Sequence, residues 1–289
     1  MGRPKISLVL GSGGARGYAH IGVIEVLERS GYEIVSISGA SMGALIGGVY
    51  ASGNLKEYTE WVLGLDVLDV ASLSDLTFSR RGMMEGKRVF EKLESMVGNR
   101  TFESLPIKLT AVATDIERKK EVWFQHGDLL SAIRASIAIP SLFTPVERDG
   151  MVLVDGGVLN PLPIAPTMSD MSDMTIAVNL YADKPRPEIV LPQKAREEKY
   201  TLKTVSGELM ERLYDAADGD ATMFTILDKT FDTMQNALTR YHLGSYPPDI
   251  LIDISKEVCH SYDFHKASEV IEAGRMAAES ALNRQTANR

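Results

Sequence analysis

The chain has 289 residues, 44% of them hydrophobic and 24% charged, and its formal net charge at pH 7 is −8. This length is enough to bury a large core, in one α/β domain or in two smaller ones. The acidic balance has no compensating basic stripe and argues against nucleic acid as a partner, and the single cysteine, Cys259, excludes an internal disulfide framework.

The sequence holds no apolar run long enough to cross a bilayer, and no signal-peptide pattern precedes the first apolar strand. Any contact with a membrane is therefore expected to be peripheral. We expect a cytoplasmic protein, and a peripheral position at the inner face of the membrane is compatible with this pattern.

Apolar strands alternate with helices along the first part of the chain. The first helix places Ile21, Ile24 and Leu27 at near-helical spacing, and Gly31 is a natural stop for it. The pattern is irregular over residues 55–99, which we interpret as helical cover near the mouth of a pocket. The elements expected here are strand Ile6–Leu10, helix Tyr18–Ser30, a strand from Ile34 to the turn at Gly39, helix Met42–Ala51 and helix Lys87–Val97.

The alternation continues and ends in a longer helical part. The expected elements are strands Lys108–Thr114 and Glu121–Gln125 around a charged turn, helix Leu129–Ser136, strands Met151–Val154 and Met174–Leu180, an exposed loop over 183–200, a helical region over about 203–242, strand Asp249–Ile254 and helix Lys266–Asn283. This predicts an α/β fold of three layers, with a central, mostly parallel sheet and helices on both faces. We expect one domain over 1–289, with its core at about 5–182 and a helical C-terminal part at about 200–285.

A Gly-x-Ser-x-Gly turn ends the second strand and begins the next helix. This strand–turn–helix arrangement is the nucleophile-elbow pattern, with Ser41 at its apex. Gly39 and Gly43 leave room for a strained serine backbone, and the unpaired amides of the helix, from Met42 onward, face the serine hydroxyl. The motif also occurs by chance in ordinary glycine-rich turns, so catalysis needs support from the rest of the chain.

A glycine-rich loop, Gly11-Ser12-Gly13-Gly14-Ala15-Arg16-Gly17, lies between the first strand and the first helix. A dinucleotide-binding loop requires G-x-G-x-x-G, but the last glycine of that pattern falls on Arg16, and neither a ribose-binding acid nor a Gly-Lys-Ser/Thr follows. The loop suits an oxyanion hole, in which backbone N–H groups converge on an anion without interference from Cβ atoms. A tight turn without chemistry is the alternative.

A serine nucleophile needs a base. The histidines that follow the serine in α/β-hydrolase order lie at a helix end or around a polar turn, namely His242, His260 and His265. Asp155, in contrast, follows a strand, and Gly156 and Gly157 behind it allow a close approach of the backbone. A carboxylate with a pKa near 4 is a weak base for a hydroxyl, but burial raises that value. Asp155 is therefore the better candidate, with a plain Asp-Gly turn as its alternative.

The order and spacing of three blocks resemble the patatin-like phospholipases: Gly13-Gly14-Ala15-Arg16-Gly17, Gly39-Ala40-Ser41-Met42-Gly43 and Asp155-Gly156-Gly157. Segments similar to the bacterial branch of that family are Ala113–Ile116, Ala132–Pro140 and Asn160–Pro163. The resemblance runs from about Ile6 to Leu180 and returns more weakly over Thr222–Ile254. Ala40 stands where threonine is common, and Pro140-Ser141 where Pro-Gly is usual, and neither departure removes a catalytic group.

The resemblance implies a patatin-like α/β sandwich that hydrolyses acyl esters of phospholipids, lysophospholipids or related lipids through an acyl-serine intermediate. It implies a dyad of Ser41 as nucleophile and Asp155 as base, without a catalytic histidine. It places the oxyanion hole on the amides of Gly13 and Gly14, with Arg16 in support; the first helical amide, Met42, joins this set. The supporting motif positions are Gly11, Gly17, Gly39, Gly43, Gly156 and Gly157. No cofactor or metal ion is implied.

Other functions remain open at this point. A regulatory or lipid-binding protein would keep the pocket with little turnover, and an acyltransferase would pass the acyl group to an alcohol at the same site. A nucleotide-binding α/β protein is disfavoured by the glycine spacing. The segments 55–99 and 183–221 match the family least, so head-group and acyl-chain preference stay undetermined, as does the oligomeric state.

Overall fold

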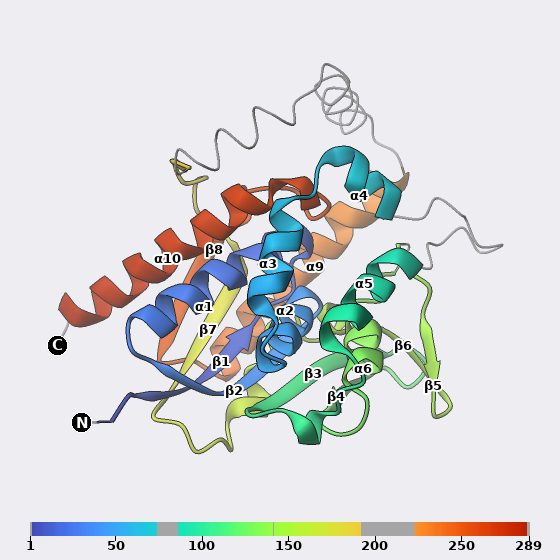
Figure 1. The fold of residues 1–289 in the computed structure, drawn as a ribbon, viewed down its shortest axis with the longest axis horizontal. Helices are drawn as coiled ribbons and strands as arrows, with labels where there is room; N and C mark the ends of the chain where they lie inside the picture. Colours follow the sequence, from blue (N-terminus) through green and yellow to red (C-terminus); the bar gives the residue numbers. More distant parts are fainter. Residues whose placement is uncertain (1, 74–85, 141, 192–222, 288–289) are drawn as a thin grey trace.

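The computed structural model describes residues 2–73, 86–140, 142–191 and 223–287. At the centre of this part lies an eight-stranded mixed sheet with the order β5-β6-β3-β2-β1-β7-β8, while β4 pairs with β3 beside this path (Figure 1). The strands are β1 (Lys5–Leu10), β2 (Glu33–Ala40), β3 (Lys108–Asp115), β4 (Lys120–Phe124), β5 (Val146–Arg148), β6 (Met151–Asp155), β7 (Met174–Ala182) and β8 (Ile250–Ser255).

The helices follow the positions expected from the sequence. They are α1 (Ala19–Arg29), α2 (Met42–Ala51), α3 (Leu55–Leu63), α4 (Val67–Leu73), α5 (Lys87–Val97), α6 (Leu129–Ser136), α9 (Met223–Ser245) and α10 (Ala267–Ala287). Within the described ranges, no helix combines the length and apolar character needed to cross a membrane. Residues 192–200 of the expected loop and 203–222 of the expected helical region lie outside the described residues. The short strand β5 was not expected.

The sheet is parallel through its centre and antiparallel at one edge. Strands β3, β2, β1, β7 and β8 run parallel, as predicted, whereas β3 pairs antiparallel with β4 and β6. The charged turn after β3 explains the reversal at β4, because a short connection joins antiparallel strands and cannot make a parallel crossover. Asp155 ends β6, which is also antiparallel to β3, and it pairs with Ala113. The sequence predicts Asp155 near the site because open α/β sheets place their sites at the carboxyl ends of parallel strands. That reason is wrong for the antiparallel β6, although the carboxylate still reaches the site.

Alternate residues of the central strands bury two separate apolar layers. Leu8 and Leu10 of β1 point into the larger core, with α1, α2 and α10, while Val9 joins a smaller cluster on the other face. Leu243 of α9 packs against that smaller cluster. Because side chains of a strand alternate between faces, helices cover both sides of the sheet. The predicted three-layer arrangement is confirmed (Figure 1).

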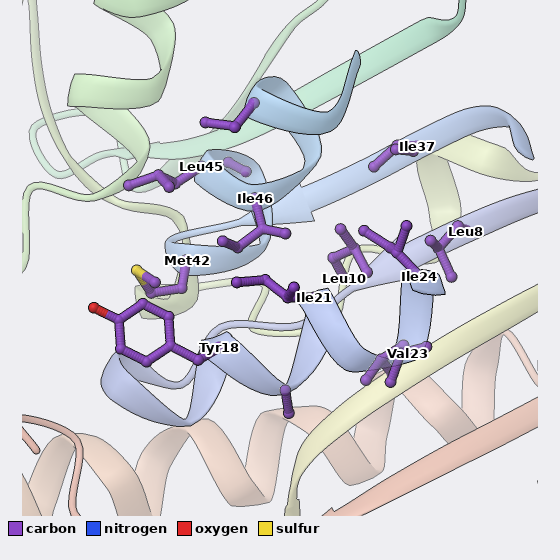
Figure 2. Packing of buried hydrophobic residues seen from close by; sticks show 14 of the residues in the cluster. Leu8, Leu10, Tyr18, Ile21, Val23, Ile24, Ile37, Met42, Leu45 and Ile46 are labelled. Atoms are coloured by element: carbon purple, nitrogen blue, oxygen red, sulfur yellow. The ribbon is translucent and has the colours of Figure 1, made fainter. Parts of the chain in front are cut away.

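Helix α2 lies very close to the sheet. Figure 2 shows Leu10, Ile21 and Ile46 meeting where β1, α1 and α2 come together. A Cβ atom at Gly47 would approach Ile37 Cγ2 to 2.8 Å, so the helix faces the sheet with a residue that has no side chain. This close packing holds the start of α2, and with it the serine turn, at the carboxyl ends of β1 and β2.

Helices α1 and α10 approach each other backbone to backbone. A Cβ at Gly22 would lie 2.1 Å from the Ile271 carbonyl oxygen, and one at Gly274 would lie 2.1 Å from that of Ala19. Real side chains cannot occupy such distances, so each glycine is required by the other helix.

We predict that Gly22→Ala lowers the free energy of unfolding by about 1–3 kcal/mol, because the new methyl group forces the two helices apart. Gly244→Ala in α9 is the matched control, since its Cβ would meet nothing within 4 Å. That substitution should stabilise by about 0.5–1 kcal/mol through helix propensity alone. Urea unfolding measures both; equal effects of the two substitutions would contradict the close approach.

Candidate active site

Ser41 occupies the sharp turn between β2 and α2. Its φ of 54° and ψ of −125° are unusual for a residue with a side chain, and it is 1% exposed. A Cβ at Gly39 would lie 2.4 Å from the carbonyl carbon of Gly43, and one at Gly43 would lie 2.0 Å from Leu10 O. The two motif glycines are therefore needed for close backbone contacts, as the sequence predicted.

A second serine, Ser136, which sequence reasoning did not single out, holds the turn by a hydrogen bond to its backbone. The Ser41 N–H donates to Ser136 Oγ at 2.9 Å, and the Ser136 hydroxyl donates to the Val112 carbonyl at 2.6 Å. Ser136 is fully buried at the end of α6. The sequence indicated Ser136 only indirectly, because it lies in Ala132–Pro140, a segment similar to the bacterial patatin-like proteins.

The structure brings Asp155 to Ser41 from the other side. Asp155 is fully buried; its N–H donates to Ala138 O at 2.9 Å, and its Oδ1 accepts the Gly157 N–H at 2.7 Å. The Ser41 hydroxyl interacts favourably with this carboxylate but falls short of a direct hydrogen bond, so Oδ2 has no hydrogen-bond partner among the described residues. An unpaired, buried carboxylate oxygen next to a hydroxyl is a suitable proton acceptor.

Burial changes the proton affinity of this carboxylate. Desolvation raises the pKa of Asp155 from 3.8 to about 7, although the nearby Ser41 hydroxyl and the N–H of Gly157 act in the opposite direction. Burial thus corrects the weakness of a carboxylate as a base, and a pKa near neutrality suits a general base at physiological pH.

The glycine-rich loop lines the same cavity as Ser41 and is held at both ends. Ser12 N–H donates to Pro161 O at 2.8 Å, and Ala15 N–H donates to Ser261 O at 2.7 Å. Gly14 has a φ of 56°, and a Cβ there would lie 2.2 Å from Ser261 O, so no other residue fits. Between these anchors, the N–H groups of Gly13 and Gly14 have no acceptor in the described part of the chain.

The first amide of α2 completes this arrangement. The N–H of Met42 likewise has no acceptor among the residues that the structure describes, because it precedes the first repeating bonds of the helix. Unpaired amides at the N-terminus of a helix favour negative charge. The sequence-predicted donors are therefore free to bind an oxyanion.

Arg16 is buried behind the loop. It is 2% exposed, its Nη2 pairs with Asp232 Oδ2 of α9 at 2.5 Å, and its guanidinium carbon lies 5.0 Å from the centre of the Tyr181 ring. Burial lowers the pKa of Arg16, but Tyr181 and Asp232 outweigh this effect and raise it above the ordinary value. The arginine is thus a permanent buried cation next to the glycines of the loop.

A small cavity opens on this site. Its volume is about 60 Å³, and it is lined on one side by Ser12, Gly14 and Ser41. The apolar side is built by Ile139, Pro140, Leu142, Leu227, Phe231 and Phe264. Polar groups complete the wall: Asp228, Asp232 and Gln235 from α9, Tyr181 from β7, and Ser261 and Tyr262 from the segment between β8 and α10.

None of the described histidines lines this cavity. His20 is fully buried in α1, where its Nε2 lies 2.8 Å from Gly11 O and burial lowers its pKa to about 4. His242 lies near the end of α9 and contacts Leu159 O at 3.2 Å. The preference for Asp155 over a histidine agrees with this arrangement.

The chain is similar to several known proteins. A family model for patatin-like phospholipase matches residues 8–168. An uncharacterized NTE family protein of Mycobacterium tuberculosis is 37% identical, covering 96% of this chain and 91% of its own. Another from the same organism is 30% identical over 97% of this chain and 47% of its own. The crystal structure of VipD from Legionella pneumophila has a TM-score of 0.46 at 14% identity, covering 98% of this chain and 67% of its own.

This chain therefore belongs to the patatin-like phospholipase family, a family of lipid hydrolases.

The raised pKa of Asp155 predicts a pH dependence of stability with a definite sign. Because this pKa is about 7 in the fold and about 4 in the unfolded chain, the folded protein binds one more proton between those values. The stability contributed by Asp155 therefore falls as pH rises through this range and is constant above it. Between pH 5 and pH 8, we expect the free energy of unfolding of Asp155→Asn, measured with urea, to rise by about 2–3 kcal/mol relative to that of wild type. A pH-independent difference between the two proteins would contradict the raised pKa.

Proposed function

We propose that this protein is a serine lipid acyl hydrolase with a Ser41–Asp155 dyad, acting on carboxyl esters of phospholipids, lysophospholipids or related acyl lipids. The observation that most supports this is the buried Asp155 carboxylate beside the strained Ser41. Its pKa is near 7, and one of its oxygens has no hydrogen-bond partner in the part of the chain that the structure describes. The proposal takes the chain as a single acyl-hydrolase domain.

The proposed reaction has two halves. Ser41 Oγ attacks the ester carbonyl while Asp155 accepts the hydroxyl proton, and the negative charge on the carbonyl oxygen is stabilised by the amides of Gly13, Gly14 and Met42. The carbon–oxygen bond to the alcohol then breaks, and protonated Asp155 returns its proton to the leaving alkoxide. Water attacks the acyl-serine and gives its proton to Asp155. The bond between the acyl carbon and Ser41 Oγ then breaks, Asp155 returns that proton to Ser41 Oγ, and the fatty acid leaves.

The cavity supports an ester substrate with an apolar chain. At about 60 Å³ it has the volume of roughly two water molecules, so it suits the reacting ester group and the acyl chain must extend beyond it. Leu227 belongs to the cavity wall and is 44% exposed, so the apolar lining continues to the surface. A substrate drawn from a lipid surface would bring the protein into peripheral contact with a membrane.

We predict that wild type forms one covalent adduct with a fluorophosphonate and that Ser41→Ala forms none, because only an activated serine reacts. Ester hydrolysis should fall at least about 10³-fold in the same variant. Ser52→Ala, which removes another buried hydroxyl further along the same segment, is the control and should react like wild type. Intact-protein mass spectrometry with circular dichroism of each variant measures the outcome. Unchanged hydrolysis by folded Ser41→Ala would refute the proposal.

Asp155→Asn should lower kcat roughly 10²–10⁴-fold, because an amide cannot accept the serine proton. In wild type, kcat/KM for a soluble short-chain ester should rise with pH to a plateau above about 7, where the carboxylate is ionised. Asp170→Asn is the matched control: this carboxylate is also nearly buried, but it accepts hydrogen bonds from Ser7 and Ser36 away from the cavity. A retained rate in Asp155→Asn would point to a different base.

The same experiments separate the alternatives. Tight lipid binding without turnover, together with no fluorophosphonate adduct on folded wild type, would favour a regulatory or lipid-binding protein. Acyl transfer to an added alcohol in preference to water would favour an acyltransferase.

A further inference from the structure

Helix α9 lies outside the residues matched by the family model. It nevertheless reaches the glycine-rich loop and the loop that follows Asp155. Asp232 and Gln235 are three residues apart, so they project from the same side of the helix. Asp232 pairs with Arg16 of the glycine-rich loop, and Gln235 accepts a hydrogen bond from the Tyr181 hydroxyl of β7.

The loops and the helix converge at Gly157. A Cβ atom at this position would lie 2.5 Å from Gln235 Nε2, 2.6 Å from Ser12 Oγ and 3.0 Å from Asp155 Oδ1. The missing side chain thus allows α9, the glycine-rich loop and the Asp155 loop to meet. Gln235 is 1% exposed, so this contact is closed to solvent.

The buried charge of Arg16 is compensated by Asp232. Nε and Nη1 of the arginine are buried and have no hydrogen-bond partner among the described residues, whereas Nη2 pairs with the carboxylate of Asp232 and the guanidinium lies against the ring of Tyr181. A buried cation that loses its counter-ion is strongly unfavourable, and the arginine then moves toward water. Any such movement displaces the backbone of Gly13 and Gly14, which lie two or three residues away in the same loop.

We propose that Asp232 is a positioning residue, which acts through Arg16 to hold the oxyanion loop in the orientation that its amides need. A loop of glycine and alanine has little stiffness of its own. Backbone hydrogen bonds to other segments hold Gly11, Ser12 and Ala15, and the Arg16 N–H donates to Gly13 O, but none of these bonds uses the N–H groups of Gly13 and Gly14. The alignment of these two amides is therefore left to the anchored side chain of Arg16. Backbone donors stabilise an oxyanion only when they are already aligned, so a loosened loop slows acylation more than it weakens binding.

The kinetic part of this inference rests on the proposed hydrolase function, whereas the anchoring of the loop can be measured without it. We expect Asp232→Asn to speed hydrogen–deuterium exchange of the amides over residues 12–17. It should also lower the rate constant for fluorophosphonate labelling and kcat for a soluble short-chain ester about 10–100-fold, with little change in KM. Asp232→Glu, which keeps the charge, should recover part of both effects.

Two variants separate positioning from simple stabilisation. Arg240→Gln removes another ion pair of α9, with Asp183 at 2.6 Å, on an exposed surface, and should leave exchange of the loop and labelling unchanged. The double variant Arg16→Met/Asp232→Leu replaces both members of the ion pair, the buried arginine and the partly exposed aspartate, with apolar groups, which often restores stability. Its melting temperature should return toward that of wild type while labelling stays slow.

The proposal is overturned if Asp232→Asn keeps wild-type exchange over residues 12–17 and wild-type labelling. It is also overturned if the double variant recovers labelling together with its melting temperature, because Asp232 would then be purely structural. A wild type that never labels, but whose loop exchanges faster in Asp232→Asn, would refute the hydrolase function and leave the anchor supported.

Discussion

The site depends on the backbone contact between the start of α2 and the end of β1. A Cβ at Gly43 would lie 2.0 Å from Leu10 O, so the helix that follows the serine turn touches the strand that leads into the glycine-rich loop. This contact places the strained Ser41 beside the unpaired amides of Gly13 and Gly14. The nucleophile and its proposed oxyanion donors, far apart in the sequence, therefore sit in one rigid unit of two strands and two helices.

Two buried ionisable side chains, Asp155 and Arg16, lie next to this unit, and they differ in how far their charge is compensated. Asp155 has hydrogen bonds to only one carboxylate oxygen, so burial raises its pKa to about 7 and leaves it able to exchange a proton. Arg16 has an anionic partner, Asp232, so it stays charged despite its burial. An incompletely satisfied acid suits proton transfer, whereas a paired cation suits a fixed support.

The C-terminal elements complete what the N-terminal part begins. Ser261 O holds the N–H of Ala15, and α9 reaches Arg16 through Asp232 and the Asp155 loop through Gln235. Residues of α9 and Ser261 line the cavity together with Ser12, Gly14 and Ser41. The serine turn, the glycine-rich loop and the Asp155 loop therefore do not form the whole site by themselves.

The sequence by itself determined the local structures: the serine turn between Gly39 and Gly43, the helix over Met42–Ala51, and a carboxylate followed by two glycines at Asp155. Such features depend on steric demands and hydrogen bonds between near neighbours, which spacing and residue type record. The antiparallel direction of β6, the support of Ser41 by Ser136 and the pairing of Arg16 with Asp232 were decided by the tertiary structure alone. Each joins residues distant along the chain, and both the burial that raises the pKa of Asp155 and the ion pair that compensates Arg16 arise only once the core has closed around them.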